Sequence, residues 1–381
     1  MRRVNILFGI GEMGMGGSER LVHNLALRLD RGRFNPSVAW FIGREALKEF
    51  EDLQVPLHYV PKTKRVDFSA MRKFSRIIET ECIDIVNTQH FMPTFYAYYG
   101  CKLASKKALV YTAHSRWEIE DIPLKWRVAG GYLLRRIDAS VGVAPDVSRA
   151  IQSVFKTKAS RTVTIENGVD TDVFAPKKNA TGLRAELGLT ERDTVIGIVA
   201  NLKEVKNHRF LLQAFARVAE ELDSVKLLIV GRGSMGESDN TEDDVRLFVN
   251  NHRLAARVLF LGYRTDIPEL LQAMDIFCLT SLREGLPIGL IEAMATGLPV
   301  VGTNVEGIRD VITPNVDGIL VELGDVAALK NALVGLVREQ GWRDRLGRMG
   351  REKGVKKYSL QRCIAEYEQL FLAALNSARS R

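Results

Sequence analysis

The sequence predicts an α/β protein with two Rossmann-like, doubly wound domains, and three observations lead to this class. Short apolar strands alternate with amphipathic helices through both halves of the chain. The strands are nearly continuous runs of Val, Ile and Leu, which is typical of parallel sheets covered by helices on both faces. The chain has 381 residues, enough for two such domains, and its 46% hydrophobic and 26% charged residues are those of a globular protein.

The expected strands are divided evenly between the two halves. They lie at residues 4–10, 83–88, 109–112, 139–143 and 162–165, and then at 195–200, 226–230, 258–261, 276–279 and 299–302. Helical patterns lie between them, for example at 18–31, 207–222 and 242–252. Strands that alternate with helices predict parallel sheets, and a ligand cleft between the domains at the carboxyl ends of the strands.

One stretch in the middle of the chain loses this alternation. Residues 174–190 contain Pro176, two lysines and Gly182, and are predicted to link the domains. The first domain is therefore expected at 1–175 and the second at 176–357. A last helix, near 359–377, lies beyond the strand pattern of the second domain.

The cysteines and apolar runs restrict the class of protein. The four cysteines have no C-x-x-C spacing, which predicts reduced thiols in a cytosolic protein and argues against a disulfide framework or a zinc site. They are Cys82, Cys101, Cys278 and Cys363. No apolar run approaches the ~20 residues of a membrane-spanning helix, and the short opening run predicts a strand and not a signal peptide.

Basic residues are concentrated in the first half. Residues 1–175 hold 26 Lys and Arg against 19 Asp and Glu, whereas residues 176–381 hold 28 against 27. The densest cluster contains Lys62, Lys64, Arg65, Arg72, Lys73, Arg76, Lys102, Lys106 and Lys107. A solvated helix face, an anionic membrane surface and nucleic acid could each explain this charge. Nucleic acid is the least favoured because no nucleic-acid-binding motif accompanies it.

The segment 284–303, EGLPIGLIEAMATGLPVVGT, has the features of a phosphate cradle between two carboxylates. Gly285 allows the backbone to approach a ligand closely, and Pro287 suits a first helical turn. The free N–H groups at such a turn can bind a diphosphate. Glu284 and Glu292, eight residues apart, can accept hydroxyl hydrogen bonds on either side of it. A nucleotide sugar has this sequence of groups.

This segment strongly resembles the E-x7-E signature of retaining glycosyltransferases of family 4, which have the two-Rossmann-domain fold called GT-B. The resemblance implies that Glu284 contacts the donor sugar and Glu292 the ribose. It also implies an acceptor-binding first domain, a nucleotide-sugar-binding second domain, and a C-terminal segment, 358–381, that crosses back to the first domain. A surface loop followed by a core helix is the alternative explanation of the segment.

The glycine-rich loop after the first strand has two possible functions. Gly9, Gly11 and Gly14 match G-x-G-x-x-G, but the second strand ends near 39–42 without an acid to bind a ribose, so NAD is not expected. Gly16 and Gly17, followed by Ser-Glu-Arg, instead resemble the family's GGxER element, which approaches the donor phosphate. A purely structural turn, with the helix beginning at Ser18, is the alternative.

Other positions extend the resemblance in the first domain. His114 follows a strand in YTAHS, where the family has a histidine that touches or orients the donor sugar. The element from Ile165 to Asp170, with the turn Asn167–Gly168, matches the one leading into the linker, and its expected role is structural. The family's frequent His-x-His is replaced in DIVNTQH by Asn87 and Gln89, followed by His90, and these three are expected on the acceptor side.

The second domain departs from the family at one cation. Lys206 stands at the position of the family's phosphate-binding lysine, but Asn201 replaces the usual arginine. Lys203 and Arg283 could each supply the missing charge. Three further residues match family loops near the nucleotide: Gly231, Tyr263 and Arg264.

The resemblance implies transfer of a hexosyl unit with retention at the anomeric carbon. Glu284, His114 and Lys206 are the expected catalytic residues, and the backbone N–H groups of Gly285 and Leu286 would help to stabilise the leaving diphosphate. No metal or other cofactor is expected, because no clear Asp-x-Asp element follows a strand. The leaving phosphate is expected to take the acceptor proton. UDP-sugars are the favoured donors and GDP-mannose the second choice.

The acceptor is expected to be a glycan or lipid-linked, in polysaccharide or lipopolysaccharide biosynthesis. Residues 122–137 mix Trp126 and Tyr132 with four basic residues, and the double glycine at 130–131 weakens the case for a helix. The segment would suit contact with an anionic membrane, although burial in the core is equally compatible. A cytoplasmic protein, peripheral on the inner membrane in that case, is expected. Two alternative functions stay open: a nucleotide-sugar 2-epimerase on the same fold, and a catalytically silent subunit of a glycosylation complex.

Overall fold

The structure, a computed structural model, describes residues 2–14, 16–44, 46–64, 66–103, 107–176, 181–233 and 238–380, so Arg65 and Lys106 of the basic cluster lie outside the described residues. The chain divides into two compact units. Unit 1 comprises Met1–Asn167 and Gln361–Arg381, and unit 2 comprises Gly168–Leu360. The acceptor-binding and donor-binding roles expected for the two domains remain predictions. The units are described one at a time below.

Unit 1 is built on a seven-stranded parallel sheet with the order β3-β2-β1-β4-β5-β6-β7. Its strands are β1 Val4–Glu12, β2 Phe34–Ile42, β3 Leu57–Tyr59, β4 Ile85–Gln89, β5 Ala108–Ala113, β6 Ala139–Gly142 and β7 Thr162–Thr164. The strand order reverses between β1 and β4, and a doubly wound sheet binds its ligands beside such a reversal, at the carboxyl ends of the strands. β4 and β5, whose ends lie beside this point, are buried along their whole length.

Two of these strands differ from the prediction: β2 is longer than predicted from the sequence, and β3 was not predicted. β2 begins at Phe34, well before 39–42, and includes Pro36, which lacks the N–H that a ladder normally uses. β3 has only three residues, too few to show a pattern.

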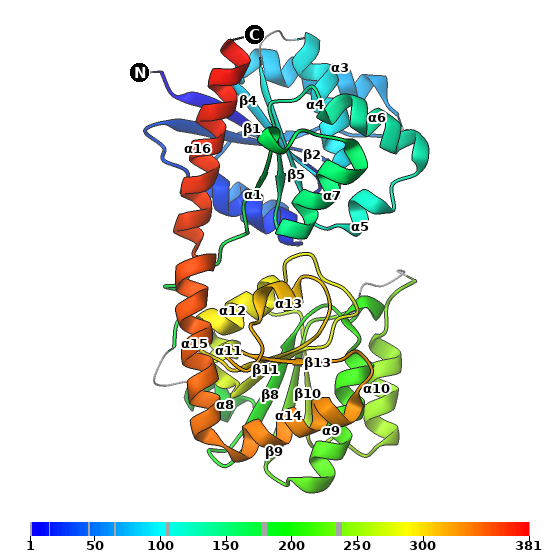
Figure 1. The fold of residues 1–381 in the computed structure, drawn as a ribbon, viewed down its shortest axis with the longest axis vertical. Helices are drawn as coiled ribbons and strands as arrows, with labels where there is room; N and C mark the ends of the chain where they lie inside the picture. The colour runs from blue at the N-terminus through cyan, green and yellow to red at the C-terminus, as the bar shows by residue number, and fades with distance from the viewer. Residues whose placement is uncertain are drawn as a thin grey trace. The chain divides into compact units, whose positions relative to one another are not determined.

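The helices of unit 1 include the C-terminal one. They are α1 Gly17–Arg28, α2 Leu47–Glu51, α3 Phe68–Thr80, α4 Phe91–Leu103, α5 Trp117–Glu120, α6 Leu124–Leu134, α7 Pro145–Phe155 and α16 Leu360–Arg379, with a 3-10 turn η1 Ala159–Arg161. Figure 1 shows α16, in red, beside the blue strands. The ring of Phe371 packs 6.1 Å from that of Phe8 and 6.4 Å from that of Phe34, and Glu368 accepts a hydrogen bond from the N–H of Asp30 at 2.8 Å. The predicted return of the last helix to the first domain is confirmed.

The helix α6 corrects an expectation about the segment 122–137. The double glycine suggested a weak helix, yet α6 continues through Gly130 and Gly131. A Cβ on Gly130 would lie 2.6 Å from Cε1 of Phe155 and 2.9 Å from Cε2 of Phe91. The glycines therefore allow α6 to pack closely on its neighbours, and this packing compensates for their low helix propensity.

Unit 2 is a second doubly wound domain, with a six-stranded parallel sheet in the order β10-β9-β8-β11-β12-β13. Its strands are β8 Thr194–Val199, β9 Val225–Val230, β10 Val258–Gly262, β11 Ile276–Leu279, β12 Val300–Thr303 and β13 Ile319–Val321. Its helices are α8 Thr181–Glu186, η2 Glu204–Lys206, α9 His208–Glu221, α10 Glu242–Asn251, α11 Ile267–Ala273, α12 Ile288–Thr296, α13 Ile308–Val311, α14 Val326–Arg338 and α15 Gln340–Tyr358. The order reverses between β8 and β11. The strand β13, which has three residues, is not among the strands predicted from the sequence.

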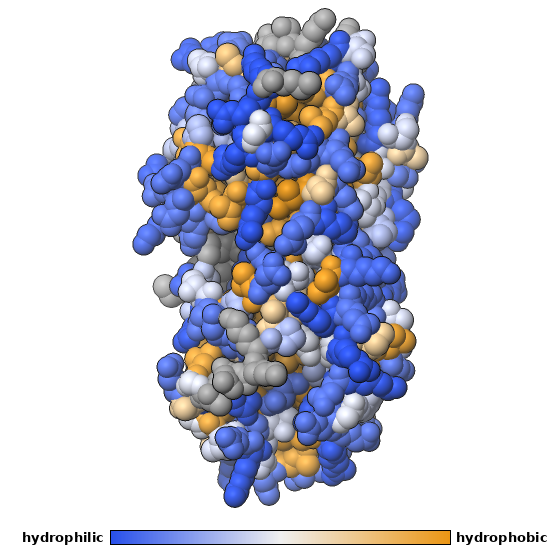
Figure 2. Space-filling view, turned by 90° about the vertical axis from the view of Figure 1, so that its left-hand side faces the viewer, coloured by the Kyte–Doolittle hydropathy of each residue, from blue (hydrophilic) through white to orange (hydrophobic). Residues whose placement is uncertain are grey.

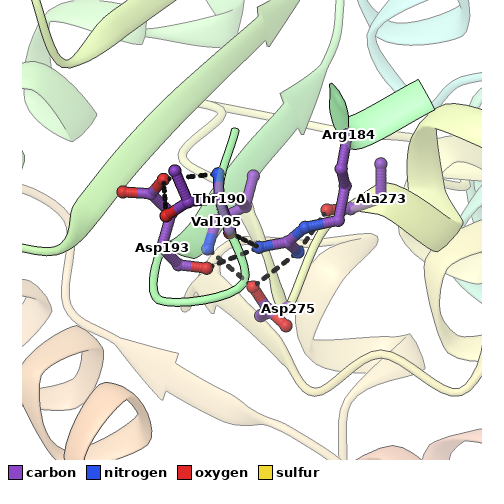
Figure 3. Close-up of polar contacts among 6 residues, drawn as sticks. All are labelled: Arg184, Thr190, Asp193, Val195, Ala273 and Asp275. Atoms are coloured by element: carbon purple, nitrogen blue, oxygen red, sulfur yellow. Dashed lines mark hydrogen bonds and ion pairs between the residues drawn. The ribbon is translucent and has the colours of Figure 1, made fainter. Parts of the chain in front are cut away.

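A polar network holds the amino-terminal side of β8 (Figure 3). The guanidinium of Arg184 donates to the backbone oxygens of Ala273 at 3.0 Å and Asp193 at 2.5 Å, and to the carboxylate of Asp275 at 3.2 Å. The same Asp275 oxygen accepts from the N–H of Val195 at 2.7 Å. These bonds tie α8 and the turn after it to the sheet, at the end of β8 opposite the one where a ligand would bind.

The surface and the helix lengths give two further findings. On the face drawn in Figure 2, hydrophobic residues form small areas among hydrophilic ones. In the described part of the chain, no helix combines the length and the apolar character that crossing a membrane requires.

Candidate active site

The loops that follow β8 and β11 bring two predicted residues of unit 2 together. Nζ of Lys206, the last residue of η2, lies 2.6 Å from Oε1 of Glu284. Oγ of Ser281 donates to the same carboxylate oxygen at 2.5 Å. Glu284 is 8% exposed. Since β8 and β11 are neighbours in the sheet, residues about 80 positions apart form one ion pair at its carboxyl edge.

Backbone and hydroxyl hydrogen bonds fix the loop that carries Glu284. The N–H of Leu282 donates to the carbonyl of Val205 at 2.8 Å, and Thr303 Oγ1 donates to the carbonyl of Ser281 at 2.6 Å. Gly307 lies directly against the loop: its φ is +80°, and a Cβ there would be 2.5 Å from the carbonyl oxygen of Glu284. Any side chain at 307 would displace Glu284, so this glycine belongs to the site.

The turn after Glu284 is shaped as an anion-binding turn but begins later than expected. Pro287 is the N-cap of α12, with φ −78°, and the helix begins at Ile288, so the proline precedes the first helical turn. Among the described residues, the N–H groups of Gly285 and Leu286 have no hydrogen-bond acceptor. They are available for an anion. Glu292 lies within α12 and is buried, on a different element from Glu284.

Two other predicted cations of unit 2, Lys203 and Arg264, lie against aspartates. Lys203 lies 3.8 Å from the carboxylate of Asp239. Arg264 forms a bidentate pair with Asp266, which raises the pKa of the guanidinium and lowers the pKa of the carboxyl group. Arg283 is exposed. Lys206 contacts a predicted acid, Glu284, at 2.6 Å.

The loop after β9 carries one predicted nucleotide-binding residue, Gly231, close to another, Tyr263, in the loop after β10. Gly231 has φ +139°, and a Cβ on it would lie 2.0 Å from the carbonyl oxygen of Ala200, which no other residue could tolerate. The N–H of Gly231 donates to the carbonyl of Gly262 at 2.8 Å, next to Tyr263. Tyr263 is exposed, and the guanidinium of Arg232 lies 5.4 Å from its ring centre.

Unit 1 brings its predicted polar residues into one chain of hydrogen bonds. His114 follows β5, and its Nε2 lies 2.8 Å from Oε1 of Gln89, at the end of β4. Nε2 of Gln89 donates to Oδ1 of Asn87 at 2.8 Å. Asn87 and Gln89 are fully buried, whereas His114 is partly exposed. Burial lowers the pKa of His114 well below its ordinary value, and His90 lowers it further.

His90 forms a charged pair beside this chain. Its Nδ1 lies 2.8 Å from Oε2 of Glu118, at α5, and its ring centre is 4.9 Å from that of His114. Burial alone would lower the pKa of His90, but Glu118 and, more weakly, Glu19 outweigh burial, and the pKa is raised. His90 has φ +65°, an uncommon conformation for a residue with a side chain. The two neighbouring histidines therefore have pKa values shifted in opposite directions.

The predicted phosphate-binding glycines of unit 1 lie at the start of α1. Gly16 is the N-cap and Gly17 the first helical residue, so the helix begins one residue before Ser18. A Cβ on Gly16 would lie 2.6 Å from Oε2 of Glu19, which also accepts a hydrogen bond from Ser18 at 2.9 Å.

Three site residues were missed in the sequence. Ser281 and Gly307 could have been found from their positions, because Ser281 stands three residues before Glu284 and Gly307 follows the next strand. Glu118 had no signal, because only the folded chain places α5 beside His90. In the described part of the chain, His, Cys, Asp and Glu side chains form no group of three that could hold a metal ion.

Comparison with known proteins agrees with this arrangement. The model of the family "Glycosyltransferase Family 4" matches residues 15–173, and that of "Glycosyl transferases group 1" matches residues 180–353. The chain belongs to glycosyltransferase family 4. It is a glycosyltransferase, and the predicted family is confirmed.

Relatives of this glycosyltransferase cover most of its length. The chain is 25% identical over 336 residues to N-acetyl-alpha-D-glucosaminyl L-malate synthase of Bacillus anthracis, covering 87% of this chain and 85% of the relative. It is 28% identical over 305 residues to UDP-Gal:alpha-D-GlcNAc-diphosphoundecaprenol alpha-1,3-galactosyltransferase of Escherichia coli, covering 76% of each. The solved structure of Anabaena HepE in complex with UDP and glucose superposes with a TM-score of 0.85 at 21% identity, covering 96% of this chain and 99% of that one. The GT-B fold predicted from the sequence is confirmed.

Proposed function

We propose that this glycosyltransferase moves a hexosyl unit from a nucleotide-diphosphate sugar to a glycan or lipid-linked acceptor, with retention at the anomeric carbon. The observation that carries the proposal is the Lys206–Glu284 pair, 2.6 Å apart, beside the unpartnered N–H groups of Gly285 and Leu286. This arrangement offers a cation and two donors to a diphosphate, and a carboxylate to the hydroxyl groups of a sugar.

The proposed chemistry follows from where charge develops. As the bond between the sugar and the diphosphate breaks, negative charge grows on the leaving phosphate, and Lys206 with the two N–H groups would stabilise it. Glu284 would accept a hydrogen bond from a sugar hydroxyl, and Glu292 would serve the ribose. The leaving phosphate would take the proton of the acceptor hydroxyl. No metal ion is required in this scheme, because the protein supplies the compensating charge.

A uridine donor is favoured by the proteins that this chain resembles, with GDP-mannose second. HepE is solved in complex with UDP and glucose, and the E. coli relative is named for a UDP-Gal donor. The same relative is named for a diphosphoundecaprenol acceptor, and another similar structure is a lipopolysaccharide outer core galactosyltransferase. These names support a lipid-linked acceptor in cell-surface polysaccharide or lipopolysaccharide synthesis.

The outer face of α6 supports contact with an anionic membrane. Leu124, Val128 and Tyr132 recur every four residues on this helix and are 74%, 67% and 47% exposed. The guanidinium of Arg136 lies 3.6 Å from the ring centre of Tyr132. An exposed apolar stripe with basic residues beside it suits the headgroup region of anionic lipids. Sedimentation with anionic vesicles, and loss of it in Leu124→Ser/Val128→Ser, would test this part of the proposal.

A donor panel tests the proposed function. Purified protein is mixed with UDP-, GDP- and ADP-sugars, and thermal stabilisation and nucleotide release are measured for the wild type, Glu284→Ala and the control Glu191→Ala, which changes an exposed glutamate of unit 2. One donor should stabilise the wild type and slowly release its nucleotide, and Glu284→Ala alone should lose the release. Failure of every donor would contradict the proposal and favour a silent subunit, and an isomerised nucleotide sugar would favour an epimerase.

A further inference from the structure

The hydrogen bonds of Asn87 fix the orientation of its amide group. One terminal atom of this side chain lies 3.3 Å from the carbonyl oxygen of Val110 and 3.1 Å from Oγ1 of Thr112. A backbone carbonyl can only accept a hydrogen bond, so the atom facing it must be the NH₂ nitrogen. The oxygen of Asn87 therefore points the other way, toward Gln89.

The orientation of Asn87 decides that of Gln89. The Asn87 oxygen accepts from the Gln89 atom 2.8 Å away, which must then be the nitrogen Nε2. This leaves the oxygen of Gln89 facing Nε2 of His114, at 2.8 Å. An amide oxygen cannot donate, so Nε2 of His114 must carry the proton of this bond. The carbonyl of Val110 on β5 thus fixes, through the amides of Asn87 and Gln89, which ring nitrogen of His114 carries the proton.

The state of the second ring nitrogen follows from the surroundings of His114. Burial, and then His90, lower its pKa, so the ring is neutral near pH 7 and Nδ1 carries no proton. The other group that lowers its pKa, His90, is itself paired with Glu118 at 2.8 Å. Among the described residues Nδ1 has no hydrogen-bond partner, and it is not one of the buried unsatisfied atoms. Its lone pair is therefore accessible from outside.

We propose that Asn87 and Gln89 are positioning residues that hold His114 as its neutral Nε2–H tautomer, so that Nδ1 accepts a hydrogen bond from a hydroxyl group of a sugar substrate. The proton on Nε2 follows from the hydrogen-bond geometry, the bare Nδ1 follows from the neutral state of the buried ring, and only the identity of the hydroxyl rests on the proposed function. His114 in this state cannot act as a proton donor toward the ligand through Nδ1. The Asn-x-Gln pair thereby specifies an acceptor at this point of the site.

Histidine NMR tests the tautomer without any substrate. The chain has six histidines, so ring ¹³C and ¹⁵N shifts of histidine-labelled protein can be assigned with His114→Gln. The wild type should show His114 neutral and protonated at Nε2 at pH 7. A ring protonated at Nδ1, or charged at pH 7, would overturn the proposal whether or not the protein proves to be a transferase.

Two variants on β4 sharpen this test. Gln89→Met removes the acceptor, so His114 should lose its single tautomer and show exchange between both. Val86→Ala is the matched control: it is buried in the same strand, and its side chain has no polar atom. It should leave His114 unchanged. If Gln89→Met fails to fold, the wild-type spectrum alone decides; if it folds and keeps the Nε2–H signature, the role of Gln89 is wrong.

A kinetic readout separates the inference from the proposed function. Gln89→Glu places a carboxylate against Nε2–H and should raise the pKa of His114 by at least one pH unit, as followed by NMR. With an active donor, the acid limb of kcat/KM should move upward by the same amount. If NMR shows the raised pKa of His114 but the pH profile of kcat/KM does not move, the tautomer assignment is retained and the contact with a hydroxyl group is refuted.

Discussion

The two units hold polar groups at their sheet edges in different ways. Unit 2 places a full positive and a full negative charge in contact, Lys206 and Glu284, with Ser281 donating to the same carboxylate oxygen. Unit 1 places neutral amides in a row, Asn87 and Gln89, ending on His114 with its pKa lowered. The charged pair of unit 2 suits a ligand group whose charge changes during a reaction. The neutral amides and histidine of unit 1 suit hydroxyl groups, which are recognised by the direction of their hydrogen bonds.

The largest expected effect comes from removing the charge at the edge of unit 2. Glu284→Gln keeps the shape but leaves Lys206 without its counter-charge and weakens acceptance from a sugar hydroxyl. We expect kcat/KM for the donor found in the panel to fall by about 10²–10³-fold, or about 3–4 kcal/mol. Steady-state kinetics measure this, with Glu191→Gln as the control. A fall of less than about fivefold would mean that the pair is structural.

The second effect concerns a buried histidine next to the charged edge. Burial and, to a smaller extent, Lys206 together lower the pKa of His208 to about 4. The depressed pKa contributes stability that is present above the ordinary value near 6.5 and is lost as the pH falls toward about 4. This loss amounts to roughly 3 kcal/mol.

Urea unfolding between pH 7 and pH 4 measures this loss. His208→Gln should reduce the slope of stability against pH, while His252→Gln, which changes an exposed histidine, should retain it. Equal slopes in the wild type and His208→Gln would show that His208 takes up a proton without cost in the folded state.

The third effect is expected on stability alone, at the polar network of Arg184 in unit 2. Arg184 serves four backbone and carboxylate oxygens at the amino-terminal end of β8 (Figure 3). Lysine cannot reproduce this planar fork, so Arg184→Lys should cost about 1–2 kcal/mol of unfolding free energy. Under conditions where the variant is folded, its kcat/KM for the donor should stay within twofold of the wild-type value. The exposed Arg192→Lys serves as control, and a specific kinetic defect in Arg184→Lys would contradict this expectation.

The smallest effect is expected at the charged pair of unit 1. The pKa of His90 is raised, so its pair with Glu118 adds stability fully below pH ~6.5, and this contribution is lost as the pH rises through the folded-state pKa. Because His90 is partly exposed, Glu118→Gln should cost about 1 kcal/mol or less. Thermal unfolding at pH 6 and pH 9 should show a larger deficit at pH 6. A larger deficit at pH 9 would contradict the assignment of charge to His90.

The difference between the units also explains what could be predicted from the sequence. The cradle of unit 2 depends on the local geometry of one chain segment, so Glu284, Gly285 and Leu286 could be recognised together. Lys206 could be placed because it stands at the position of the family's lysine. The pairing of Arg264 with Asp266 could not be placed in the same way, because side-chain partners depend on rotamers that spacing does not specify.

In unit 1 the relevant contacts join three separate elements. Gln89, His114 and Glu118 come from β4, the end of β5 and α5, and no spacing in the sequence reports their distances. The fold was predictable where strands are long and apolar. It was missed for β3 and β13, which have three residues each, and α6 was doubted because helix propensity ignores the close packing that Gly130 and Gly131 permit.

Calorimetric titration with UDP tests most directly the claim that unit 2 holds a nucleotide diphosphate through Lys206. The wild type and the control Lys356→Met, an exposed residue of α15, should bind UDP alike. Lys206→Met should bind at least tenfold more weakly, a loss of about 1.4 kcal/mol or more, while Glu284→Gln should keep UDP affinity within about threefold because its partner is the sugar. Absence of UDP binding to the wild type, or equal binding by Lys206→Met, would contradict the account.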